Sequence, residues 1–179
     1  MIRYHAAVQM AVKRDEMNKK QRSSDSLPIP QACHPKVRQI VEYWDSKRPA
    51  PDVLPGRQHL DPVDIPDLLS NVWLIDVTRD PLRFRFRLLG TAVVEYAGED
   101  NTGKWFDEAL PNFDPGVFID VVETHEPTWT RSASRMRPYK EYRELERVRM
   151  PLARDGKTVD MILCLTVFFD KDGKEIKKG

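Results

Sequence analysis

Histidine and cysteine are the residues of this chain best suited to bind a metal or carry covalent chemistry, and there are four of the first and two of the second. The histidines share no ligand spacing such as H-x-x-x-H. They are His5, His34, His59 and His125. No G-x-G-x-x-G, G-x-x-x-x-G-K-[ST] or G-x-S-x-G pattern is present, and prolines flank the paired acids Asp61 and Asp64, as in a capped turn. We therefore expect a protein that is not an enzyme, with an enzyme as the competing class.

A basic run in the last third of the chain could contact phosphate or nucleic acid. Its members are Arg131, Arg135, Arg137, Lys140, Arg143, Arg147 and Arg149. Glu141, Glu144 and Glu146 lie among them, and cross-strand ion pairs on a solvated sheet face would use the same residues. Residues 1–22 carry a net charge of +4 and the remainder −3, so the larger part is mildly acidic. We expect no nucleic-acid partner.

Composition and cysteine use bound the class of protein. With 179 residues, 40 % hydrophobic and 32 % charged, the chain is long enough for one well-buried domain with extensions. Cys33 lies in a proline-rich loop and Cys164 in a strand-like run, which argues against a disulfide and favours the cytoplasm. Gln9, Lys13 and Arg14 interrupt the apolar residues near the start, and no run of about 20 apolar residues occurs. We predict a cytoplasmic protein without a membrane span.

Two amphipathic helices are predicted before the first strand. Tyr4, Ala7, Val8 and Ala11 recur at helical spacing, so a helix is expected over residues 3–20. Its small apolar stripe fits either a mobile or weakly docked extension or a helix that docks a partner protein or forms a homodimer. We expect a homodimer that involves residues 3–20. The second helix, over residues 35–47, begins at a proline suited to a first turn. Its wider stripe must be buried, and the residues of that stripe are Val37, Ile40, Val41 and Trp44.

Five strands are expected, in two groups separated by short helices. The predicted strands are residues 72–77, 82–89, 128–137, 142–152 and 159–169. Apolar residues alternate with arginine in the second, so one face is dry and the other wet. The residues expected to face the core are Leu82, Phe84, Phe86 and Leu88, and those expected to face water are Arg83, Arg85 and Arg87. A capped helix that begins after Asp114-Pro115 and ends before Pro127 precedes the third strand.

This order of elements, with three short motifs, resembles the PAS domain, most closely a subfamily of domains of unknown function. The motifs are Leu54-Pro55-Gly56-Arg57, Phe86-Arg87-Leu88-Leu89-Gly90-Thr91 and Asn101-Thr102-Gly103-Lys104. The resemblance implies an α+β fold whose five-stranded antiparallel sheet has the order 2-1-5-4-3, with helices covering one face. It divides the chain into an N-terminal helical extension and linker (1–33), the PAS-like domain (34–170) and a charged tail (171–179).

The resemblance also implies a cavity between the sheet and the helices, where family members often hold a small molecule. The residues expected to line it are Phe84, Phe86, Leu88, Tyr96, Trp105, Phe118, Val122, Leu163 and Leu165. The alternative is that these side chains fill one another's space, since proteins pack densely by default. The expected function is a single PAS-like sensory or signalling domain that binds a small molecule or partner protein and signals by protein–protein interaction. A ligand-free interaction scaffold is the alternative.

No cofactor is assigned. Haem-binding PAS domains take an axial histidine from the helix before the third strand, where His125 lies, so the resemblance makes His125 a haem candidate. At a helix end beside Glu123 and Glu126, the ordinary explanation of His125 is a solvent-facing imidazolium. The flavin-binding relatives require a reactive cysteine in the helical segment, and residues 101–105 contain none.

Overall fold

Five antiparallel strands in the order β2-β1-β5-β4-β3 form one sheet, which confirms the expected strand order. The computed structural model describes residues 29–111, 113–134 and 144–177. The strands are β1 (Val72–Thr78), β2 (Arg83–Leu89), β3 (Thr128–Ala133), β4 (Glu144–Leu152) and β5 (Met161–Phe169). The helix predicted over residues 3–20 lies outside the described residues, as do the end of the third predicted strand and the start of the fourth.

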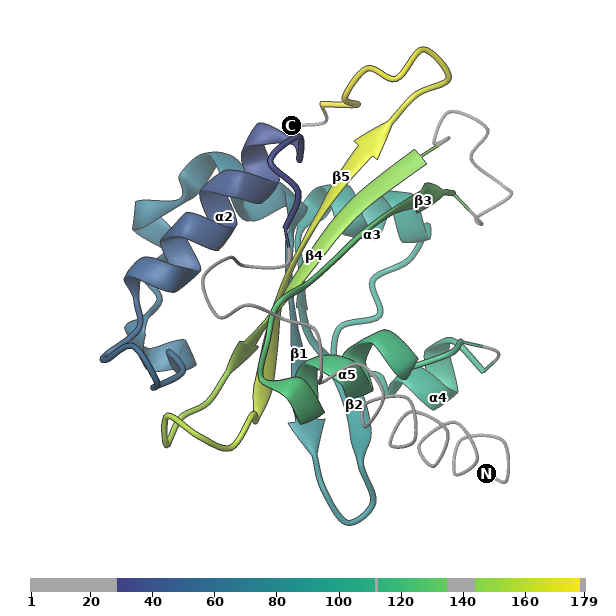
Figure 1. Cartoon of the computed structure of the whole chain (residues 1–179). Helices are drawn as coiled ribbons and strands as arrows, with labels where there is room; N and C mark the ends of the chain where they lie inside the picture. Colours follow the sequence, from purple (N-terminus) through teal and green to yellow (C-terminus); the bar gives the residue numbers. More distant parts are fainter. Residues whose placement is uncertain (1–28, 112, 135–143, 178–179) are drawn as a thin grey trace, which may run out of the picture.

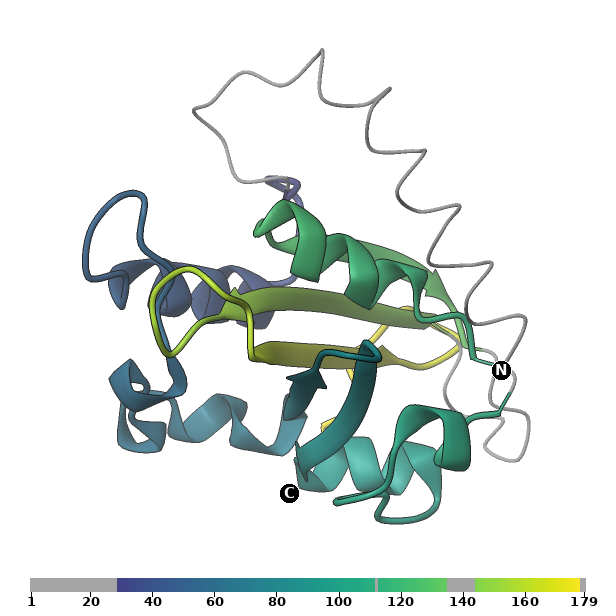
Figure 2. The ribbon, with the colours of Figure 1, turned by 90° about the horizontal axis from the view of Figure 1, so that it is seen from below.

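Helices lie on both sides of this sheet (Figure 1). The α-helices are α2 (Pro35–Ser46), α3 (Thr91–Ala97), α4 (Phe106–Ala109) and α5 (Gly116–Thr124), and the 3-10 helices are η1 (Arg57–His59), η2 (Pro62–Asp64) and η3 (Pro66–Asn71). Seen from below, α5 lies along β4 (Figure 2). Helices α3, α4 and α5 form the layer expected of a PAS fold, and α2 lies on the other side.

Two neighbouring aromatic residues of β5 establish this arrangement. Phe168 stacks against Tyr96 of α3 with ring centroids 5.0 Å apart, whereas Phe169 contacts the ring of His34, just before α2, at 5.7 Å. Successive side chains of a strand point to opposite faces, so the two helix layers cover opposite faces. We call them the α5 face and the α2 face. Strand β5 is therefore buried on both sides, and only its first residue, Met161, is more than slightly exposed.

Helix α2 is held against its face by packing and by specific hydrogen bonds. Its predicted apolar stripe is buried as expected. The indole Nε1 of Trp44 donates to the carbonyl of Pro151 at 2.8 Å. At the helix start, Pro35 occupies the first turn and the Nδ1 atom of His34 accepts the backbone N–H of Lys36 at 3.2 Å. The imidazole thus acts as an N-cap and fixes where the helix begins.

A bulge in β2 reverses the alternation predicted for that strand. Ile75 pairs with Phe86 and Leu74 pairs with Leu88, so Arg87 is an extra residue between them. A bulge of this kind moves every following side chain to the other face. Leu88 is consequently 45 % exposed, and Leu89 packs against the core in its place. The prediction that Leu88 faces the core is wrong for this reason.

The bulge can be tested with a pair of adjacent substitutions. We expect Leu88→Ala to change the free energy of unfolding by less than about 0.5 kcal/mol, as at other exposed positions. Leu89→Ala removes contacts with the core and should cost about 2 kcal/mol. Urea denaturation of both variants beside the wild type measures the difference. A larger loss at Leu88 than at Leu89 would show that β2 keeps its alternation without a bulge.

Candidate functional site

An aromatic cluster occupies the α5 face where β1 and β2 meet α4 and α5. The ring of Phe118 lies 5.7 Å from that of Phe84 and 5.9 Å from that of Trp73. Phe86 lies 4.4 Å from Phe106, and all five rings are buried. Of the predicted cavity residues, Phe84, Phe86 and Phe118 are thus brought together. Direct ring contacts show that here the side chains fill one another's space, as in the alternative weighed above.

Two further residues of the cluster were missed from the sequence. Trp73 lies in β1, directly opposite Leu89 and Cys164, and so faces α5. Phe106 opens α4. Trp73 sits in a run of buried apolar residues where alternation gives no face, and Phe106 begins a helix of only four residues, too short for a periodic pattern.

Val122 is buried in α5 and belongs to the same core as the aromatic cluster. The other predicted cavity residues lie elsewhere. Leu163 and Leu165 are buried on the α2 face, because the row that faces α5 is the alternate one, with Cys164 at its centre. Their expected convergence with Phe84 is therefore wrong. The strand alternation was predicted correctly, but it does not show which helix layer each face meets.

Tyr96 and Trp105 also lie apart from the main cluster. Tyr96 packs in a separate small cluster with Phe168, and its hydroxyl lies 3.1 Å from that of Ser134. Trp105 pairs with Arg85 along the outer edge of β2, and the guanidinium of Arg83 stacks 4.1 Å from its ring. A residue paired with Arg85 shares the face to which the arginine points, so Trp105 covers arginines and not the aromatic cluster.

His125 is the C-cap of α5. It is exposed and adopts the left-handed conformation with φ 60° that often ends a helix. The structure thus places His125, the haem candidate, at the exposed end of α5, where its side chain faces solvent.

Arg149 is the most unusual polar residue on the α5 face. It lies in the middle of β4 and is only 4 % exposed. Its Nη1 donates to the hydroxyl of Thr130 at 3.3 Å, and its guanidinium lies 5.2 Å from the centre of the Phe118 ring. Its Nε is buried with no hydrogen-bond partner. Within the described part of the chain no carboxylate lies within ion-pair distance of Arg149.

The residues beside Arg149 in the sheet do not compensate its charge. Thr128 lies directly opposite on β3, and its hydroxyl is also buried without a partner. Cys164 lies opposite on β5, and burial raises the pKa of its thiol to about 12, so the thiol is neutral at pH 7. Burial likewise lowers the pKa of Arg149 to about 10, well above neutral pH. The result is a buried cation facing a hydroxyl that has its own hydrogen bond to donate.

The importance of Arg149 was missed because it belongs to the basic run that was interpreted as a solvated face. That interpretation holds for Arg131, which pairs with Glu144 at 2.8 Å on an exposed part of the sheet. It fails for Arg149 because β4 is buried on both faces, a property that depends on two distant helices.

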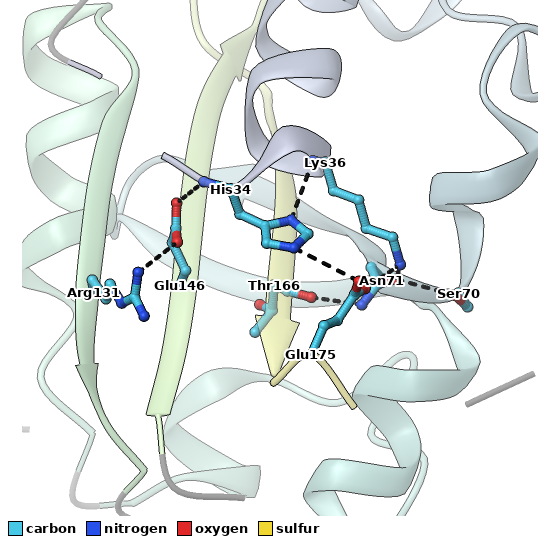
Figure 3. A network of polar contacts seen from close by, with 8 residues as sticks. All are labelled: His34, Lys36, Ser70, Asn71, Arg131, Glu146, Thr166 and Glu175. Carbon is cyan, nitrogen blue, oxygen red and sulfur yellow. Dashed lines mark hydrogen bonds and ion pairs between the residues drawn. The ribbon is translucent and has the colours of Figure 1, made fainter. Parts of the chain in front are cut away.

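A polar network on the α2 face shows how this protein treats its other buried charges (Figure 3). Glu146 is fully buried, yet its Oε1 accepts the backbone N–H of His34 at 2.8 Å and the indole N–H of Trp129 at 3.0 Å. Its Oε2 lies 3.7 Å from Arg131 but accepts no hydrogen bond. The charge of this carboxylate is therefore balanced by a nearby cation, and its other oxygen by two donors.

The same network joins the start of α2 to the last described residues, which follow β5. The Nζ of Lys36 lies 2.6 Å from Glu175 and donates to the side-chain oxygen of Asn71 at 3.0 Å. Asn71 in turn donates to the carbonyl of Thr166 at 2.8 Å (Figure 3). Each charge drawn in Figure 3 lies near an opposite charge, so we interpret this network as structural. Arg149 differs from these residues, because no carboxylate in the described part of the chain lies within ion-pair distance of it.

Neither a metal-binding group of side chains nor a membrane-spanning helix is found among residues 29–111, 113–134 and 144–177. This part of the chain holds no group of three or more histidine, cysteine or acidic side chains that could bind a metal ion. In the same residues no helix has both the length and the apolar composition needed to cross a bilayer.

Burial of Cys164 has a measurable consequence for stability at alkaline pH. Its pKa is about 12 in the folded protein against 9.0 for an ordinary thiol, so only the unfolded chain loses this proton between pH 9 and 12. Stability is then fully present below pH 9 and is lost as the pH rises. The test compares the Cys33→Ala variant with the double variant Cys33→Ala, Cys164→Ala. Between pH 7 and pH 10, we expect the free energy of unfolding to fall by about 1 kcal/mol more in the variant that keeps Cys164. Equal pH dependence with and without Cys164, by urea denaturation, would contradict the assignment.

Comparison with protein families agrees with this fold. The family model described as PAS domain matches residues 32–166, about three quarters of the chain. No curated protein matches the chain significantly. The match spans α2, all the helices of the α5 face and the sheet up to the middle of β5. On this match and on the strand order 2-1-5-4-3, the chain belongs to the PAS domain family.

Proposed function

We propose that this chain is a sensory PAS module that binds a small anionic molecule on the α5 face at Arg149 and signals through protein–protein interaction. One observation carries the proposal: a guanidinium that is 4 % exposed, has an unpartnered Nε and has no carboxylate partner in the described chain. An isolated buried charge costs several kcal/mol unless it is paired. A bound anion would supply the missing charge.

The geometry around Arg149 indicates which anion would fit. Phe118 covers one face of the guanidinium, which leaves its in-plane N–H groups for an acceptor. The hydroxyl of Thr128 is a second buried donor, on the residue directly opposite. A carboxylate has two oxygens in one plane and suits such a pair of donors. The crowded apolar surroundings limit the remainder of the molecule to a small organic group, so we propose a small carboxylate.

Binding at this place would be communicated to α5. Phe118 belongs to this helix and contacts both the guanidinium and the aromatic cluster, so a ligand at Arg149 changes what α5 packs against. A ligand shifts a conformational equilibrium only by its differential affinity for the two states. The guanidinium, neutralised in one state and not in the other, would provide that difference.

We propose that the output is association with a partner protein or with a second copy of the chain, and not catalysis. The notion of a homodimer rests on the amphipathic pattern of residues 3–20, which lie outside the described structure. The cytoplasm is the proposed location, supported by two cysteines that are both free and buried.

A ligand-free interaction scaffold is the second candidate. It is favoured by the direct ring contacts of the aromatic cluster, which leave the β2 side of the α5 face filled. The two candidates differ in what Arg149 does: it binds a ligand in the first and is a tolerated structural residue in the second.

Arg149→Met tests the proposal because it keeps the volume and removes the charge. If the cation exists for a ligand, the variant should be as stable as the wild type or more stable by about 1 kcal/mol or more. Native mass spectrometry of the wild type should show a small mass excess that is lost on denaturation and is absent from Arg149→Met. Arg149→Lys serves as the control that keeps the charge without the planar fork. A loss of more than about 2 kcal/mol in Arg149→Met, with no mass excess in the wild type, would make Arg149 structural.

Deletion of residues 1–26 tests the proposed homodimer. The full chain should scatter light as a dimer, and the deletion variant as a monomer. A second variant, Ala7→Asp, keeps the full length and places a charge in the predicted apolar stripe. It should also weaken the dimer. A dimer that persists in both variants would remove this role from the N-terminal segment.

A further inference from the structure

A groove of about 590 Å³ opens on the α2 face, between η1, the turn before β5, the first residue of β5 and the bulge of β2. Its lining residues are Arg57, Gln58, Arg87, Arg154, Asp160 and Met161. We call it the arginine groove. It lies on the opposite face of the sheet from Arg149, because Met161 pairs with Asp76, and Asp76 pairs with Arg85 on the arginine side of β2. It is therefore a separate site, and it does not depend on the proposed function above.

The bulge in β2 places Arg87 at the groove. Arg87 is the residue without a partner in β1, and its side chain is 59 % exposed. Its Nη1 is 4.0 Å from Asp76, a carboxylate that Arg85 already binds at 2.7 Å. Bulges commonly redirect a side chain toward a functional site. The guanidinium of Arg87 is thus left with most of its donors free for a ligand.

The other two arginines are carried by loops that are bonded to each other. The backbone N–H of Leu54 donates to the carbonyl of Gly156 at 3.0 Å, and that of Ala153 donates to the carbonyl of Pro55 at 2.9 Å. Gly156 has φ 79°, and a Cβ there would lie 2.5 Å from the side chain of Val53, so any other residue would be strained and would displace Val53.

A side-chain bond reinforces this contact between the loops. The amide of Gln58 donates to the carbonyl of Arg154 at 3.1 Å, which connects η1 to the turn before β5. Arg57 donates to the carbonyl of Leu60 at 2.8 Å, a bond that orients its guanidinium without neutralising it. The backbones that carry Arg57 and Arg154 are therefore preorganised, which lowers the entropic cost of binding.

The charge in the groove is not balanced. Among the lining residues three guanidinium groups face one carboxylate, that of Asp160, which leaves a local charge of +2. Asp76 also lies near Arg87, but it is paired with Arg85, and counting this pair leaves the excess unchanged. In the described residues no carboxylate lies within ion-pair distance of Arg57 or Arg154. Guanidinium groups bind phosphate oxygens in a two-pronged geometry, and a phosphate monoester carries a charge of about −1.5 to −2 at pH 7. This charge matches the excess in the groove.

We propose that the arginine groove binds the phosphoryl group of a small phosphate ester. Arg87 and Arg154 bind the phosphoryl oxygens, and Arg57 completes the positive rim. A volume of about 590 Å³ lies within the usual range for small-molecule sites and leaves room for an organic group beside the phosphate. The half-buried side chain of Met161 offers that group an apolar surface.

Isothermal titration with adenosine monophosphate as the probe tests the proposal, with adenosine as the matched ligand without phosphate. The full chain should bind the monophosphate at least ten times more tightly than adenosine. Arg87→Gln and Arg154→Gln alter exposed side chains and should each weaken binding about tenfold while leaving the urea midpoint unchanged. Lys171→Gln removes the same charge near the far end of β5, from a side chain that is 77 % exposed, and should bind as the wild type does.

Three results would overturn the proposal. The first is equal affinity for adenosine and its monophosphate. The second is unchanged binding in both Arg87→Gln and Arg154→Gln. The third is binding of a phosphoserine peptide, but not of the monophosphate or inorganic phosphate, which would make the ligand a modified protein. Arg149→Met separates the two proposed sites: it should leave this binding intact, and loss of binding there would place the phosphate on the α5 face.

Discussion

Burial of β5 on both of its faces is the constraint on which this structure depends. A strand in the middle of a sheet with helices on either side has no exposed side, so every residue from Ile162 to Phe169 must be apolar or fully hydrogen-bonded. Thr166 satisfies this requirement with its hydroxyl, which accepts the indole N–H of Trp73, and with its carbonyl, which accepts from Asn71. The positions of α2 and α5 follow from the two rows of side chains that β5 presents.

The same constraint gives unusual weight to charges on the neighbouring strand. Glu146 and Arg149 are three residues apart on β4 and so lie on opposite faces, both nearly inaccessible to water. The acid is surrounded by Trp129, His34 and Arg131, whereas the base meets a ring and hydroxyl groups. The Oε2 of Glu146 accepts no hydrogen bond, but the carboxylate has an opposite charge 3.7 Å away, whereas Arg149 has none in the described residues. The two buried charges therefore differ in whether a charge of the opposite sign lies beside them.

Local patterns in the sequence predicted the elements well and their relations less well. The stripe of α2 and the existence of strand β5 each depend on residues close in sequence, and both were predicted correctly. Three things depended on distant partners: which helix layer meets Leu163, the bulge that exposes Leu88, and the burial of Arg149. A bulge is specified by how two strands pair and has no reliable mark in one of them. The helix predicted over residues 3–20, and the dimer it would form, stay predictions.

The contact of His34 with Glu175 has a consequence for how this domain can be connected to other proteins. The imidazole Nε2 lies 3.6 Å from the carboxylate, and the backbone N–H of Ile176 donates to the carbonyl of Phe168. The first helix of the domain and its last described residues therefore meet at one corner. A domain whose entry and exit adjoin can be spliced into a surface loop of a host protein without stretching the host's chain. The contact of His34 with Glu175 and the bond from Ile176 to Phe168 thus fix the short distance between the two ends of the described domain.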